Sequence, residues 1–353
     1  MVRTSNNFTV ARLLLALLVV FSHSYPLGGW PEPVVLGRTP GGLAVQSFFA
    51  ISGYLIVGSY ISTAQPVLFA WKRFCRLAPA LFVVVPFSLQ LFHWQNQYAG
   101  NPMGEIANGA LWTLSWEGLM YIITLLLGVT GLLTAPVLGG VCLAGLVVLF
   151  TDLKGLSTSA YVIAPFFVAF AIGGLIRLNE GQLHLRGCGI FASAALILAY
   201  LPVTKGAFDA LQGPMMFHYG PSIPWERLQW FMSLVAIPFV VLFICRAFPV
   251  SLQIEQDYSY GVYIFGWPIQ QTLVHQAIEA RFPLEPSALF FSSALLSLAC
   301  AAISWHLVEK NGLWLGQRVA KFRFSKPVSL SPPDVDLATA HWDRESVRRR
   351  KAL

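Results

Sequence analysis

The sequence contains few charged residues. Only 11% of its 353 residues are Asp, Glu, Lys or Arg, whereas 56% are hydrophobic and the mean hydropathy is +0.63. Soluble globular domains carry about 25% charged residues. The composition therefore excludes an ordinary soluble domain and predicts a polytopic membrane protein embedded in a lipid bilayer.

Cysteine motifs, internal repeats and ATP-binding motifs are lacking as well. The five cysteines are scattered singly, mostly within apolar stretches, without Cys-x-x-Cys or Cys/His spacing. We therefore expect neither a disulfide framework nor a bound metal ion. The lack of a repeat gives no support to an inverted-repeat transporter.

Basic residues are concentrated near the C-terminal end. The net charge is +7, and ten of the 23 Lys and Arg residues follow Glu309. Such a run is typical of a cytoplasmic tail near anionic lipid, so we expect no nucleic-acid partner. We predict that residues 312–353 form a basic, disordered tail, most clearly from Ser325 onward, after a membrane domain at residues 1–311.

Long apolar runs predict an all-α fold with about ten transmembrane helices, because about 20 apolar residues span a bilayer core. The predicted helices are 8–25, 43–61, 76–92, 111–128, 135–151, 160–177, 187–203, 228–246, 258–275 and 287–308. The first resembles a signal peptide, but Arg12 interrupts it and many spans follow, so we expect it to be retained. Placing both termini in the cytoplasm puts most basic residues inside, which predicts an N-in, C-in topology.

The first predicted helix carries Arg12 and His23 in an otherwise apolar stretch. Ionisable groups at bilayer depth are costly and are functional candidates by default. The two residues are eleven apart, which corresponds to about 16 Å and nearly three helical turns, so both lie on one face. Arg12 is expected in the inner half and His23 near the outer face. The alternative is a snorkelling arginine and an imidazole at the membrane interface.

Two further patterns point to a bound anion and to a path for a slender ligand. Arg73 and Arg76 lie three residues apart at the predicted start of the third helix, where paired guanidiniums favour phosphate binding. Taken alone, the pair is explained more simply by retention of positive charge on the inner side of the membrane. Ser52 and Gly53 lie in the middle of the second helix, where small residues admit either a ligand or a neighbouring helix.

Glu117 lies about two turns into the fourth predicted helix, at a depth comparable to that of His23. A carboxylate close to an imidazole tunes a general base. We therefore predict that Glu117 interacts with His23. The alternative is an isolated glutamate packed among Trp and Ser side chains, which is less favourable because burial of a charge is costly.

Six segments, in order, resemble those of a known family, from about residue 6 to residue 311. They are Asn7-Phe-Thr-Val-Ala-Arg12 through Phe21-Ser-His23-Ser24, Phe48-Phe-Ala-Ile-Ser52-Gly-Tyr-Leu55, Lys72-Arg73-Phe-Cys-Arg76-Leu-Ala-Pro79, Leu111-Trp-Thr-Leu-Ser-Trp-Glu117, Tyr258-Ser259-Tyr-Gly-Val-Tyr263-Ile-Phe-Gly-Trp267-Pro268 and Ser304-Trp-His-Leu-Val-Glu309-Lys310. The chain thereby resembles acyltransferase family 3, the integral membrane O-acyltransferases. It departs from the family at Gly266, where many members have His, and at Glu309-Lys310-Asn311, where the family has an acidic residue followed by Pro.

The resemblance implies transfer of an acyl group, usually acetyl, from cytoplasmic acyl-CoA to hydroxyls of surface or secreted polysaccharide, at a bacterial inner membrane. It implies that His23 is the essential histidine and that the arginine pair serves the CoA donor. Taken with the residue patterns described above, this predicts His23, Glu117 and Arg12 as catalytic residues and Arg73, Arg76, Ser52 and Gly53 as acetyl-CoA-binding residues.

A transporter or flippase for an anionic or glycosylated lipid is the main alternative, because the same residues could line a pathway. A non-catalytic partner of a polysaccharide synthase is a weaker one. Release of free thiol from acyl-CoA distinguishes the enzyme from both.

Overall fold

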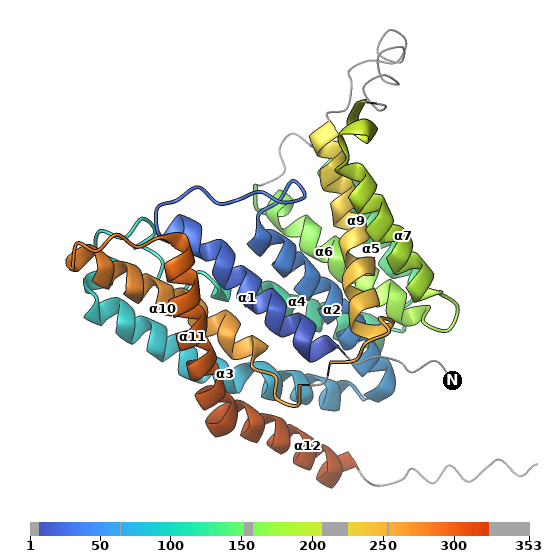
Figure 1. Ribbon diagram of the computed structural model, residues 1–353. Helices are drawn as coiled ribbons and strands as arrows, with labels where there is room; N and C mark the ends of the chain where they lie inside the picture. Colours follow the sequence, from blue (N-terminus) through green and yellow to red (C-terminus); the bar gives the residue numbers. More distant parts are fainter. Residues whose placement is uncertain (1–6, 64, 152–157, 207–224, 253, 325–353) are drawn as a thin grey trace, which may run out of the picture. The chain divides into compact units, whose positions relative to one another are not determined.

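The protein is all-helical over the residues that the computed structural model describes, which are 7–63, 65–151, 158–206, 225–252 and 254–324 (Figure 1). The helices are α1 (Phe8–Leu27), α2 (Pro40–Thr63), α3 (Pro66–Trp94), the short η1 (Asn96–Tyr98), α4 (Leu111–Val129), α5 (Ala135–Thr151), α6 (Thr158–Leu178), α7 (Leu185–Ala199), α9 (Trp225–Arg246), α10 (Ser259–Glu279), α11 (Pro286–Ser304), η2 (Trp305–Glu309) and α12 (Lys310–Phe324). The prediction of an all-α fold is confirmed, and each predicted apolar segment overlaps one of these helices.

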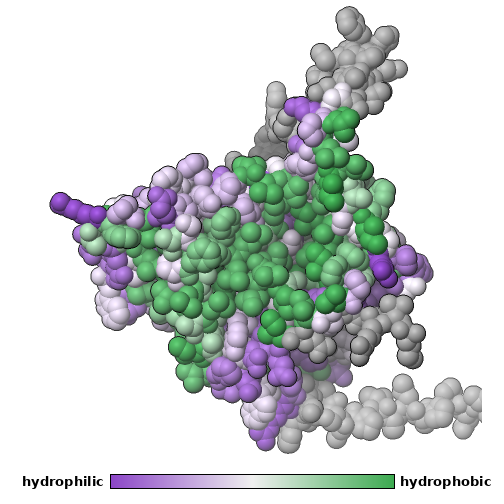
Figure 2. Space-filling model, in the orientation of Figure 1, coloured by the Kyte–Doolittle hydropathy of each residue, from purple (hydrophilic) through white to green (hydrophobic). Residues whose placement is uncertain are grey.

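Among the described residues, six helices are long and apolar enough to cross a membrane. They are α1, α2, α3, α4, Arg227–Arg246 and Pro286–Val319, and shorter apolar helices cover Ala135–Phe150, Val162–Leu178 and Leu185–Ala199. Figure 2 shows hydrophobic residues over the middle of one face and hydrophilic residues nearer the helix ends. Large apolar side chains such as Leu14, Phe291 and Leu295 are exposed on the surface of the protein. Apolar side chains on the outside suit a surface that faces lipid.

Helix α10 differs from the apolar helices because it is enclosed by protein. It is buried along most of its length and packs against α1, α3 and α11. Several of its polar side chains are hydrogen-bonded: the amide nitrogen of Gln270 donates to the carbonyl of Val20 and to Ser24 Oγ, each at 2.8 Å. A helix surrounded by other helices can carry such groups as long as they are hydrogen-bonded.

Helix α3 begins ten residues earlier than the sequence predicts. Pro66 occupies the first helical turn, where its missing N–H is not needed, and Gln65 before it is extended. Arg73 and Arg76 therefore lie two to three turns inside α3 and not at its positive end. The predicted contribution of the helix N-terminus to anion binding at this pair is wrong.

The last helices also differ from the sequence prediction. Helix α11 passes through the π-helical turn η2 into α12, which extends to Phe324. Residues 312–324, predicted to be part of a disordered tail, are therefore helical, and residues 325–353 lie outside the described residues. The α12 glycines let the helix approach α3, since a Cβ on Gly312 would lie 2.6 Å from a carbon of Pro79. The chain divides into two units at Gly316 and Gln317.

Polar contacts gather at one end of α1, α6 and α9. Asn7, immediately before α1, donates to the carbonyl of Ile244 in the last turn of α9 at 3.0 Å. Glu180, just after α6, forms ion pairs with Arg177 and with Arg246. We call this end, where α1 begins and α6 and α9 end, the basic end. The opposite end contains the end of α1 and the starts of α2 and α9.

Candidate active site

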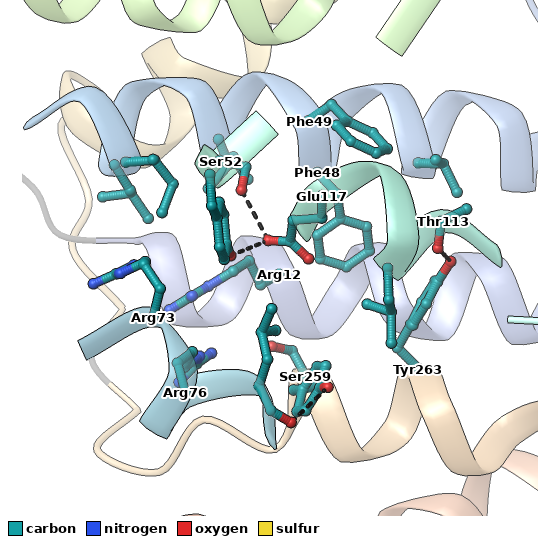
Figure 3. Close-up of a pocket in the computed structure, with 18 residues that line it drawn as sticks. Arg12, Phe48, Phe49, Ser52, Arg73, Arg76, Thr113, Glu117, Ser259 and Tyr263 are labelled. Atoms are coloured by element: carbon teal, nitrogen blue, oxygen red, sulfur yellow. Dashed lines mark hydrogen bonds between the residues drawn. The ribbon is translucent and has the colours of Figure 1, made fainter. Parts of the chain in front are cut away.

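A cavity of about 120 Å³ lies between α1, α2, α3, α4 and α10 (Figure 3). Its polar lining residues are Arg12, Ser52, Arg73, Arg76, Thr113, Glu117, Tyr121, Ser259, Tyr260 and Tyr263. Figure 3 shows Arg73 and Arg76 toward one end of the cavity and Thr113 and Tyr263 toward the other. The structure thus brings together five of the seven residues predicted from the sequence: Arg12, Ser52, Arg73, Arg76 and Glu117.

Two of the arginines share one buried carboxylate. Asp257 Oδ2 lies 3.0 Å from Arg12 Nη2 and 2.6 Å from Arg76 Nη2, and Ser259 Oγ donates to Asp257 Oδ1 at 2.5 Å. Burial raises the pKa of Asp257, but the guanidiniums of Arg12 and Arg76 and the bond from Ser259 outweigh it and lower the pKa to about 2. The carboxylate is therefore ionised at neutral pH and holds both arginines at the cavity wall.

Arg73 has no such acidic partner among the described residues. Its Nη2 donates to Ser59 Oγ at 3.4 Å, and its Nε is buried without a hydrogen-bond partner. Its guanidinium lies 5.9 Å from the ring of Phe69 and 6.0 Å from the ring of Tyr121. Arg73 therefore has hydrogen-bonding capacity to spare for an anionic ligand.

Glu117 lies in the middle of the cavity and is held by hydroxyl groups. Its Oε1 accepts from Ser52 Oγ at 2.9 Å and from Tyr121 OH at 2.5 Å (Figure 3). The structure does not bring Glu117 to His23, so the predicted interaction of the two is not observed. The reason is packing: α4 packs against α2 and α3, whereas the His23 side of α1 packs against α10.

His23 lies one turn before the end of α1 and is half-buried, outside the cavity lining. Its ring contacts the ring of Trp267 edge to face, with centroids 4.9 Å apart and planes at 82°. Trp267 Nε1 donates to the carbonyl of Ile106 at 3.1 Å, which fixes the indole. Gly266 next to it lets α10 approach α1, because a Cβ there would lie 2.8 Å from a methyl carbon of Val20. At Gly266, where the chain departs from the family, α10 and α1 therefore pack closely beside His23.

Gly53 has a packing role instead of the predicted place on a ligand path. Its α-carbon faces the carbonyl of Phe170 in α6 so closely that no side chain fits between them, and Gly173 of α6 approaches Ala50 in the same way. The two glycines let α2 and α6 pack together, which is the ordinary role of small residues between membrane helices. Ser52, one residue earlier, faces the cavity.

Sequence reasoning missed Asp257 and Tyr121. Tyr121 lies four residues after Glu117, and this helical spacing places the two side chains on one face, so the pair was detectable. Asp257 directly precedes the segment beginning Tyr258-Ser259, but 181 residues separate it from Arg76. No local pattern indicates a contact over that separation.

Comparisons with known proteins identify the class. The family model described as an acyltransferase domain matches residues 5–306, so the chain belongs to acyltransferase family 3. The chain is 30% identical over 354 residues to an O-acetyl transferase of Shigella phage Sf6, covering 88% of this chain and 96% of that protein. It is 26% identical over 381 residues to nodulation protein 10 of Rhizobium leguminosarum bv. viciae, covering 91% and 96%. No solved structure matches significantly. The predicted family is confirmed, and these matches support an O-acetyltransferase.

Proposed function

We propose that this membrane protein transfers an acetyl group from acetyl-CoA, bound from the cytoplasm, to a hydroxyl group of a glycan on the opposite side of a bacterial inner membrane. The observation that carries the proposal is the arginine-lined cavity at the basic end, in a chain that belongs to an acyltransferase family. A transporter or flippase with the same cavity would leave the thioester intact.

The basic end suits the phosphate-rich part of the donor. Arg73 supplies the buried Nε that has no partner among the described residues, and Arg76 is fixed beside it by Asp257. Guanidiniums bind phosphate oxygens through paired N–H donors, which makes them better phosphate ligands than ammonium groups. In this proposal Ser52 lies along the pantetheine arm, and Arg12 adds positive charge at the donor end of the cavity.

Transfer requires the thioester to reach His23, about 16 Å along α1 from Arg12. Phe48 and Tyr263 line the cavity, with ring centroids 5.8 Å apart, and Tyr263 OH lies 2.5 Å from Thr113 Oγ1. Figure 3 places Tyr263 and Thr113 at the end of the cavity away from Arg73. We expect the aromatic pair to separate when the pantetheine arm enters.

His23 is proposed as the general base. An imidazole nitrogen accepts the proton of the acceptor hydroxyl, whose oxygen attacks the thioester carbonyl carbon. The C–S bond then breaks, and the imidazolium returns the proton to the leaving thiolate, giving CoA thiol and an acetyl ester. An acyl-histidine intermediate would use the same residue as a nucleophile.

The proposed orientation puts the basic end in the cytoplasm, as the distribution of Lys and Arg predicts. A reporter that fluoresces only in the cytoplasm should be bright when fused at Leu353 and dark when fused at Lys205. A dark fusion at Leu353 with a bright one at Lys205 would reverse the orientation.

The activity is tested with purified protein in lipid nanodiscs. Wild-type protein should release free thiol from acetyl-CoA, and release should be faster with acceptor glycan present. Loss of O-acetyl groups from the surface glycans of a deletion strain identifies the acceptor, and a His23→Ala gene should not restore them. Intact acetyl-CoA after prolonged incubation with wild-type protein and glycans from that strain would contradict the proposal.

A further inference from the structure

A second arginine site lies at the opposite end, away from the acyltransferase cavity. Arg38 belongs to the loop between α1 and α2, and its guanidinium lies 4.2 Å from the ring centroid of Trp230, near the start of α9. Tyr200, directly after α7, lies close enough to interact electrostatically with Arg38. Gln229 Nε2 donates to the carbonyl of Ala199 at 2.7 Å, which ties the end of α7 to the start of α9 beside the site.

Three polar atoms at this site are buried without a hydrogen-bond partner among the described residues. They are Arg38 Nε, Arg38 Nη2 and Tyr200 OH. The described residues place no carboxylate in contact with Arg38. Burial lowers the pKa of Arg38 to about 10, with an opposing contribution from Tyr200, so the cation remains charged at neutral pH. An unsatisfied buried donor costs free energy, and more so when it is charged.

The chemistry of these atoms points to a particular kind of ligand. Nε–H and Nη2–H of an arginine form the edge that binds two oxygens of a carboxylate or phosphate side by side. The guanidinium lies against the Trp230 ring, which restricts its movement. The Tyr200 hydroxyl provides a further donor.

Arg227 lies at the same end and provides a comparison, because its contacts are those of an arginine with a structural role. It lies in the first turn of α9, 5.8 Å from the ring of Phe150, and its Nη2 donates to the Phe150 carbonyl at 2.7 Å. Its side chain is exposed. Arg38 has the aromatic contact, but its Nε and Nη2 are buried and have no carbonyl acceptor among the described residues, so the aromatic contact alone does not account for these donors.

The site lies at the same end as the proposed catalytic histidine. His23 is one turn before the end of α1, and Ser22 next to it accepts from Gly41 N at 2.6 Å and donates to Glu32. These bonds tie the loop that carries Arg38 to the His23 region of α1. A saccharide that presents a hydroxyl to His23 therefore extends across the same face of the protein.

We propose that Arg38 and Tyr200 bind an oxyanion, either a carboxylate or a phosphate ester, that is carried by the acceptor, so that the acceptor is an acidic saccharide. This inference rests on the proposed function, because it assigns the acceptor of the same reaction. It adds a specificity site that is separate from the cavity for the donor.

The test measures binding of three probes to the full chain in zwitterionic nanodiscs, by saturation-transfer NMR and Trp fluorescence. The probes are methyl β-glucuronide, glucose 1-phosphate and the neutral methyl β-glucoside. Wild-type protein should bind at least one anionic probe about tenfold more tightly than the neutral one. Glucuronide preference indicates a uronic acid, and phosphate preference indicates a phosphorylated saccharide.

Variants then locate the site. Arg38→Gln should weaken the preferred anion about ten- to a hundredfold, as expected for a lost charge-assisted bond, without changing the binding of the glucoside. Arg38→Lys, which keeps the charge and the aromatic contact, should have an intermediate effect. Tyr200→Phe should weaken the anion about two- to tenfold. The matched control Arg227→Gln should bind all three probes like wild type.

Equal binding of the three probes by wild type, or unchanged anion binding in Arg38→Lys and Tyr200→Phe, would overturn the inference. The same samples are assayed for thiol release from acetyl-CoA. Thiol release with no anion preference would refute the acceptor site alone, whereas anion preference without any thiol release would refute the proposed transfer and leave only an anion-binding site.

Discussion

Arg12 and Arg38 lie near opposite ends of α1 and in opposite electrostatic surroundings. Arg12 shares the carboxylate of Asp257 with Arg76, so it has an acidic partner within the protein, and the one carboxylate balances one of the two positive charges. Arg38 has an aromatic ring and a phenol beside it but no acidic partner among the described residues. A guanidinium that is paired with a carboxylate of the protein contributes to the fold without a ligand. Buried N–H donors of a guanidinium without an acidic partner gain a hydrogen-bond partner when an anion binds.

Arg73 extends this comparison to the basic end. Its buried Nε has no partner among the described residues, as at Arg38, although its neighbour Arg76 is paired with Asp257. The basic end and the opposite end therefore each have one guanidinium whose N–H donors lack a partner among the described residues. In the proposed reaction, Arg73 binds the phosphates of the donor and Arg38 binds the anion of the acceptor. His23 lies on the acceptor side.

The largest effect is expected for His23→Ala. Removal of a general base reduces the rate about 10²–10⁴-fold, because the acceptor hydroxyl loses its proton acceptor. Binding of acetyl-CoA should remain nearly unchanged, since the donor phosphates are proposed to bind at the other end. Calorimetry measures the binding, and single-turnover transfer on the same sample measures the chemical step. Loss of donor binding in His23→Ala would contradict the proposal that donor binding and the chemical step take place at different ends of the protein.

Asp257→Asn should cause the next largest effect, through the fold. It leaves Arg12 and Arg76 without their counter-charge, which for a buried pair costs about 3 kcal/mol of the free energy of unfolding. Thermal unfolding in detergent measures this loss, and Glu105→Gln, an exposed acid outside the cavity, is the control. An unchanged unfolding temperature would show that the ion pairs of Asp257 with Arg12 and Arg76 do not stabilise the fold.

The same carboxylate predicts a pH dependence. The folded-state pKa of Asp257 is about 2, below the ordinary value of about 3.9. Its contribution to stability is therefore complete above about pH 5 and is lost as the pH falls toward 2. Wild-type protein should lose stability over this range more steeply than Asp257→Asn, as followed by thermal unfolding at each pH. Parallel pH profiles would contradict the assignment.

Arg73→Ala should affect donor binding more than stability. Loss of a charge-assisted bond to phosphate raises the KM for acetyl-CoA about ten- to a hundredfold. Arg76→Ala should raise KM similarly but should also lower the unfolding temperature, because Asp257 then keeps only Arg12. Arg73→Lys should restore part of the affinity, and Arg186→Ala, an exposed arginine, serves as the control. Equal losses of stability in Arg73→Ala and Arg76→Ala would show that the ion pair of Arg76 with Asp257 does not make the two arginines differ.

Glu117→Gln should have the smallest effect. The structure bonds Glu117 to Ser52 and Tyr121, so we expect a few-fold rise in the KM for the donor without displacement of the pH–rate profile. The double variant with Tyr121→Phe should be non-additive by about 1 kcal/mol, because the two groups share one hydrogen bond. A displaced pH–rate profile in Glu117→Gln would restore the pairing of Glu117 with His23 that the structure does not show.

The helical segments could be predicted from the sequence because apolar runs of sufficient length have one stable solution in a bilayer. The boundaries were less accurate: the third helix was predicted to begin at residue 76, yet α3 begins at Pro66. Cavity residues such as Arg12 and Glu117 were predictable because charge within an apolar helix is costly wherever the helix packs. This argument identifies a residue but not its partner.

The sequence by itself determined an all-helical membrane protein with an arginine pair, an intramembrane histidine and the motifs of its family. Only the tertiary structure decided that Asp257 pairs with Arg12 and Arg76, that Glu117 is bonded to Tyr121, and that Arg38 lies on Trp230. Hydropathy and helical periodicity are local properties of the chain. The pairing of two side chains depends on how helices far apart in the sequence pack together, and no local pattern records that.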